Sequence, residues 1–126
     1  MVNIENELFS EVAGILRKQF KGIKVYSEYV NSPSSFPCVT FMEQDNYTNI
    51  ESLPLSNIEA ASNLMYEINV YSNKKNGKKQ ECKDIMSVID GIMLNKGFVR
   101  IMLNPIQNIN DDTIYRIVSR YRKIQV

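Results

Sequence analysis

Apolar residues recur at helical spacing near the start of the chain and again after its midpoint. Near the N-terminus, a candidate cap at Asn3, an acidic first turn and apolar positions three to four residues apart predict a helix that ends near Phe20. Gly22 should stop this helix, and Gly97 should stop the second one. The apolar stripe of the second helix consists of Cys82, Ile85, Met86, Ile89, Ile92 and Met93.

Five further stretches carry the β-branched, aromatic or alternating residues that are typical of strands. They cover residues 23–29, 36–44, 64–71, 98–103 and 113–124. We expect Asn104-Pro105 to break or bend the fourth strand, because proline cannot donate a hydrogen bond to a sheet. In the last strand, alternation places Tyr115 and Tyr121 on one face and Arg116 and Arg120 on the other.

The order of these elements is helix, two strands, a loop, a strand, a helix and two strands. It predicts a single α+β domain over residues 1–126, with an antiparallel sheet of four to five strands and two helices on one face. Residues 45–60 show neither the helical nor the strand spacing of apolar residues, and they predict a long loop. Such loops are uncommon within a compact domain and are usually functional or disordered.

Spaced aliphatic side chains in this loop make it a candidate oligomer interface, because exposed aliphatic groups are costly unless another surface covers them. The candidate residues are Ile50, Leu53, Leu55 and Ile58. The alternative is that these residues form a small cluster packed on their own domain, and the sequence leaves both interpretations open. A double substitution of Leu53 and Leu55 by Asp should separate an assembled form into folded monomers if the first interpretation holds.

Charge and composition narrow the possible functions. The 126 residues carry a formal charge of +1, so no long-range field draws the whole molecule to nucleic acid or to an anionic membrane. The one basic run that could face phosphate or line a DNA passage is a turn, with Lys74, Lys75, Lys78 and Lys79 around Asn76-Gly77. A solvated turn is the simpler interpretation. No apolar stretch is long enough to span a bilayer, and we expect synthesis in the cytoplasm without membrane contact.

The sequence offers few groups for catalysis. It contains no histidine, its five glycines are dispersed singly, and its only adjacent carboxylates, Asp111 and Asp112, have the composition of a turn. Cys38 and Cys82 lie in apolar patterns that indicate buried thiols rather than a zinc or redox pair. We therefore expect no enzymatic activity, no cofactor and no metal.

Most of the chain resembles the tail-terminator, or tail-completion, proteins of long-tailed phages. The resemblance lies in Tyr66 to Tyr71 (YEINVY), in the helix over 79–94 that leads to Gly97-Phe98, and in Tyr115 to Tyr121 (YRIVSRY). It implies a small structural subunit that forms a ring, a hexamer in this family, at the head-proximal end of the tail tube. Self, the tail tube protein and the head connector or stopper protein are the implied partners, and the virion tail or neck is the implied location.

Two alternatives stay open. Another neck protein, such as a head-closure or head-tail joining component, would share this size and composition. A small nucleic-acid-binding regulator would bind DNA or RNA in a salt-dependent way, although the balanced charge argues against it and no sequence-specific contact with nucleic acid is expected.

Overall fold

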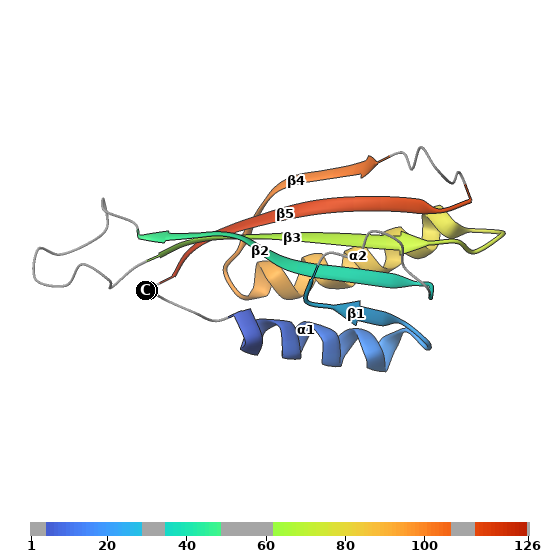
Figure 1. The fold of residues 1–126 in the computed structure, drawn as a ribbon, viewed down its shortest axis with the longest axis horizontal. Coiled ribbons are helices and arrows are strands. Elements are labelled where there is room, and N and C mark those ends of the chain that lie inside the picture. Colours follow the sequence, from blue (N-terminus) through green and yellow to red (C-terminus); the bar gives the residue numbers. More distant parts are fainter. Residues whose placement is uncertain (1–4, 29–34, 49–61, 107–112, 126) are drawn as a thin grey trace, which may run out of the picture.

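The computed structural model describes residues 5–28, 35–48, 62–106 and 113–125. Two helices and five strands follow one another along the chain in the predicted order (Figure 1). They are α1 (Glu5–Gln19), β1 (Lys24–Tyr26), β2 (Cys38–Thr48), β3 (Ser62–Ser72), α2 (Lys78–Asn95), β4 (Val99–Ile106) and β5 (Tyr115–Gln125). No helix within these residues is long and apolar enough to cross a membrane.

The five strands form one sheet in the order β1-β2-β3-β5-β4 (Figure 1). The three long strands pair antiparallel in its centre, as β2 with β3 and β3 with β5. β1 pairs with β2 in parallel, so the sheet is mixed and the expectation of a wholly antiparallel sheet is wrong at this edge. The two edges also differ in length, because β1 has three residues and β4 has eight.

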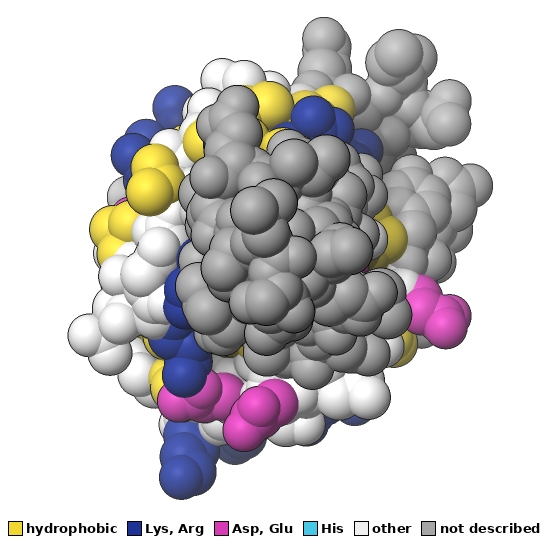
Figure 2. Space-filling model, turned by 90° about the vertical axis from the view of Figure 1, so that its left-hand side faces the viewer, with side chains coloured by type: hydrophobic (Ala, Val, Ile, Leu, Met, Phe, Trp, Pro, Cys, Tyr) yellow, Lys and Arg dark blue, Asp and Glu magenta, His cyan; other side chains and the backbone are white. Residues whose placement is uncertain are grey.

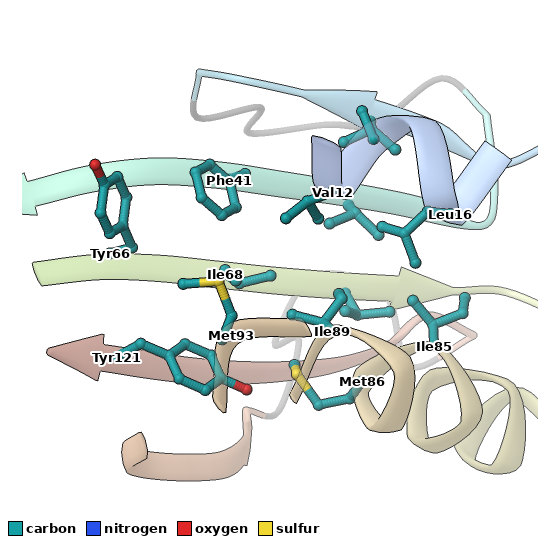
Figure 3. Close-up of a cluster of buried hydrophobic side chains, with 14 of the residues drawn as sticks. Val12, Leu16, Phe41, Tyr66, Ile68, Ile85, Met86, Ile89, Met93 and Tyr121 are labelled. Carbon is teal, nitrogen blue, oxygen red and sulfur yellow. The ribbon is translucent and has the colours of Figure 1, made fainter. Parts of the chain in front are cut away.

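Both helices pack on the same face of the sheet, as predicted, and the core lies between them and the sheet. The largest fully buried side chains include Val12 and Leu16 from α1, and Ile85, Ile89 and Met93 from α2. They meet side chains that point from the central strands toward the helices (Figure 3): Phe41, Tyr66, Ile68 and Tyr121. The face of β5 that carries Tyr121 is therefore the core face, and the arginine face lies opposite the helices.

Glycine ends α2 where the sequence predicted. Gly97 has a φ of 89°, a left-handed conformation that side chains disfavour. Its N–H donates to the Leu94 carbonyl at 3.0 Å, and the Phe98 N–H donates to the Met93 carbonyl at 3.0 Å. These two bonds satisfy the last carbonyls of the helix and turn the chain directly into β4.

Three predicted boundaries are wrong. β1 is shorter than the predicted strand over 23–29. Residues 45–48 belong to β2 rather than to a loop, because β3 supplies backbone partners that override their polar composition, with a shift in register between Glu43 and Asp45. β4 runs through Asn104-Pro105 without a break, since an edge strand tolerates proline better than a central one.

Candidate interaction surface

The two thiols are buried, as the sequence predicted, and neither has the character of a nucleophile. Burial raises the pKa of Cys38 to about 11. Burial, with a smaller contribution from Glu81, raises the pKa of Cys82 to about 12. Reactive cysteines show the opposite shift, because the thiolate is the nucleophile.

Two partly buried acidic side chains, Glu5 at the start of α1 and Glu43 in β2, lie close together. Burial raises the pKa of Glu5, and a hydrogen bond with Glu43 and repulsion from its charge raise it further. Among the described residues, no three His, Cys, Asp or Glu side chains are grouped so that they could hold a metal ion. The turn predicted at Asp111-Asp112 lies outside the described residues.

The sheet face opposite the helices carries the arginines of β5, and neighbouring side chains bind two of them, Arg116 and Arg120. Arg116 donates two hydrogen bonds to Asn69 Oδ1, at 3.0 and 2.8 Å, and lies 5.4 Å from the Tyr71 ring centre. Arg120 donates to Glu67 Oε1 at 3.0 Å. Two of the three arginines on this face are thus held by side chains of β3, which favours a structural role for them over an open basic surface.

The exposed edge strand β4 departs most from the usual surface of a small domain. Val99 is 63% exposed, Ile101 49%, Leu103 38% and Ile106 36%. Apart from Leu94, these four are the only exposed large hydrophobic residues in the described parts of the chain. Edge strands of monomeric proteins are usually short, charged or covered. β4 is eight residues long, and its protective features are limited to Arg100, Pro105 and a shift in register between Arg100 and Met102.

The register of β4 assigns its side chains to two faces. Arg100, Leu103 and Pro105 stand opposite Tyr121, Ser119 and Ile117, so they share the face that carries the helices. Val99 and Ile106 stand opposite Arg122 and Arg116 and share the outer face. Viewed from the end in Figure 2, hydrophobic and basic side chains lie beside each other along the upper margin, on the side of β4.

A groove of about 430 Å³ separates the helix-side face of β4 from α2. Apolar groups from both elements and from β5 form most of it: Met86, Leu103, Pro105, Tyr115 and Ile117. Lys79, Lys83, Ser87, Asp90 and Arg100 supply its polar lining. The groove is open because β4 extends the sheet beyond the width that one helix covers.

The charge of this lining is mostly positive. The Asp90 carboxylate, the one acidic group of the lining, already has two partners. Its Oδ1 accepts a hydrogen bond from the Tyr121 hydroxyl at 2.8 Å and lies 3.2 Å from Arg100. The side chains of Lys79 and Lys83 are exposed and form no hydrogen bond or ion pair within the described residues. The groove thus offers an apolar floor with unpaired cations along its α2 side.

The structure divides the predicted basic run between two surfaces. Lys74, Lys75 and Lys78 line a shallow depression together with Asn73 and Thr113. Lys79 instead lines the groove between α2 and β4. The predicted interface residues Ile50, Leu53, Leu55 and Ile58 lie outside the described residues.

Sequence reasoning did not identify β4 as a candidate surface. It predicted a strand there without recognising that both of its faces are exposed. A signal was present, because Val99, Ile101, Met102 and Leu103 do not follow the alternation of a half-buried strand, and Pro105 is typical of a sheet edge.

Comparison with solved structures finds proteins of similar fold, whereas comparison with sequences finds none. No protein-family model matches the sequence, and no curated protein sequence matches it. The fold is similar to the tube-terminating cap of the anti-feeding prophage, solved by cryo-electron microscopy, with a TM-score of 0.49 and 9% sequence identity. The alignment covers 100% of this chain and 56% of the cap protein, so this chain spans little more than half the length of that protein.

Proposed function

We propose that this protein is a structural subunit of a phage or prophage tail, a tail-terminator protein that assembles into a ring at the head-proximal end of the tail tube and joins the tail to the head connector. The observation that carries the proposal is the long, apolar and uncovered edge strand β4. The sequence resemblance to tail terminators indicates the kind of assembly, which is a ring at the end of the tail tube.

The exposed side chains of β4 favour association. Complete burial of an aliphatic side chain is worth about 1.5–3 kcal/mol, so covering the exposed parts of Val99, Ile101, Leu103 and Ile106 would contribute on the order of 4 kcal/mol. Backbone hydrogen bonds along the eight residues of this edge strand would add affinity and fix how the two subunits are oriented.

The two edges of the sheet differ, which limits the contacts that a ring could use. A ring forms when one surface of a subunit binds a different surface of the next and the rotation closes. β4 is long and open, whereas β1 at the other edge is a three-residue strand that offers little backbone for pairing. In a ring, β4 would therefore bind a surface of its neighbour other than the β1 edge.

The native mass of the purified protein, measured by light scattering over a concentration series and followed by negative-stain imaging, tests the proposal. We expect closed rings of roughly six subunits. A particle that remains monomeric at every concentration, alone and with tail tubes of its phage, would contradict the ring.

In such a ring, we propose that the lysine turn faces passing DNA. Its support is the depression where Lys74, Lys75 and Lys78 come together with Thr113. Lysine side chains contact phosphate without reading base sequence. A filter-binding assay with duplex DNA should show weak affinity that falls steeply with salt, and an affinity that salt does not change would remove this role.

A further inference from the structure

We propose that β4 and the groove beneath it receive residues 49–61 of a second copy of this chain, which add to the open edge of the sheet as a further strand. The inference rests on the proposed self-assembly and names the contact that carries it. The receiving surface consists only of described residues, and the segment is identified by its chemistry.

The distribution of charge along the chain favours this contact. Residues 25–73 contain six carboxylates (Glu28, Glu43, Asp45, Glu51, Glu59 and Glu67) and no Lys or Arg, a formal charge of −6. Since the whole chain carries +1, the remaining residues carry +7. Residues 49–61 belong to the acidic part and the groove to the basic part, so a contact between them brings opposite charges together.

The spacing of aliphatic and acidic residues in the segment also suits the groove. Residues 49–61 hold Glu51 and Glu59 with four aliphatic residues between or beside them. In an extended backbone, Glu51, Leu53 and Leu55 share one face, because side chains alternate with a period of two. Such a strand would place two leucines over the apolar floor of the groove and a carboxylate near its cations.

Pro54 is compatible with this arrangement. A proline biases the preceding residue, here Leu53, toward extended backbone. Neighbouring residues of a strand direct their backbone polar groups to opposite edges. When the backbone N–H and C=O groups of Leu53 and Leu55 point to β4, the backbone of Pro54 points to the opposite edge. Its missing N–H then costs no hydrogen bond with β4.

The charges of the groove argue against the main alternative, a symmetric pairing of two β4 strands. Arg100 lies at the end of the groove near Asp90, and Lys79 lies eleven residues earlier in α2, about 16 Å along the helix axis. In an antiparallel pair of β4 strands, the Arg100 end of one copy meets the Lys79 end of the other. Lys79 would then approach Arg100 at both ends, a contact between like charges that only Asp90 offsets.

A peptide-binding assay tests the contact without requiring ring formation. The probe is a fluorescein-labelled peptide of residues 47–61 (YTNIESLPLSNIEAA). The receptor is the full chain with Leu53→Asp and Leu55→Asp, so that its own segment does not compete. We expect saturable binding by fluorescence anisotropy, weakened about tenfold when Lys79→Glu and Lys83→Glu are added to the receptor.

Matched variants separate this contact from a general charge effect. Lys21→Glu with Lys24→Glu makes the same change in net charge at exposed positions beside and within β1, and should leave binding unchanged. A peptide with Glu51→Lys and Glu59→Lys should bind the original receptor more weakly and regain affinity for the Lys79→Glu, Lys83→Glu receptor.

The outcomes distinguish this inference from the proposed function. Wild-type rings together with a peptide that does not bind, or that binds both charge variants equally, would overturn the inference and leave the function standing. Peptide binding by a protein whose wild type stays monomeric would assign the segment to the groove of its own chain and overturn the second-copy contact.

Discussion

Two buried tyrosines provide a test of the packing because removal of their hydroxyl groups should have opposite effects. Tyr66 and Tyr121 are both fully buried on the helix side of the sheet. The Tyr121 hydroxyl donates to Asp90 at 2.8 Å. The Tyr66 hydroxyl has no hydrogen-bond partner within the described structure, although its ring packs 5.1 Å from Phe41 and 5.5 Å from Phe98.

Tyr66→Phe keeps the ring contacts and removes a hydroxyl that is buried without a partner. An unsatisfied buried polar group costs about 1–3 kcal/mol, so this variant should be more stable than wild type by about 1 kcal/mol. Tyr121→Phe removes a hydrogen bond to a carboxylate, worth about 1.5–3 kcal/mol. Because Arg100 still lies near Asp90, we expect a loss at the lower end, about 1.5 kcal/mol.

The assay is thermal unfolding of both variants and wild type at one protein concentration, since association would make Tm depend on concentration. For 126 residues, 1 kcal/mol corresponds to about 4 °C. Tyr66→Phe should therefore raise Tm by about 4 °C, and Tyr121→Phe should lower it by about 6 °C. A clear decrease in Tm for Tyr66→Phe would show that its hydroxyl has a stabilising partner, and would refute this description of the core.

Two further predictions concern Glu5 at the start of α1 and the glycines within and just after α2, Gly91 and Gly97. The folded-state pKa of Glu5 is raised above its ordinary value of 4.5, so its charged form opposes folding at neutral pH and stability rises as pH falls through the raised pKa. Glu5→Gln should therefore have a higher Tm than wild type at pH 7, and the difference should shrink toward pH 4.5; a constant difference between these pH values would contradict the Glu5–Glu43 contact. Gly97→Ala should cost about 1 kcal/mol because of its positive φ, whereas Gly91→Ala, at an exposed helical position with free space around it, should add about 0.5–1 kcal/mol. Urea unfolding of both variants measures this contrast, and equal effects would contradict the assigned end of α2.

The sequence was most informative where one face of an element is buried and the other is not. The alternation in β3 and β5 and the apolar stripe of α2 each follow from such burial, so the core residues were predictable. The end of α2 was predictable as well, because a left-handed residue was needed at Gly97.

Features that depend on pairing between distant strands were not predictable from local pattern. Polar residues 45–48 extend β2 only because β3 lies beside them. The position of β4 at an edge depends on the strand order of the sheet, which places β5 between β3 and β4. The groove beneath β4 depends on how far one helix covers that sheet, a property of packing that the strand pattern does not contain.

The central claim is that β4 carries self-assembly, and the most direct test is the native mass of a variant with charge on this edge. Val99→Lys with Ile101→Lys removes most of two exposed apolar side chains, worth about 2 kcal/mol of association, or roughly a thirtyfold change in affinity at each contact. Leu94→Lys, at a 51% exposed position on α2, is the control for a lysine that replaces an exposed apolar residue outside β4. Light scattering should show assembled wild type and control, and a folded monomer for the β4 variant. Assembly of the β4 variant at the same concentration as wild type would contradict the claim.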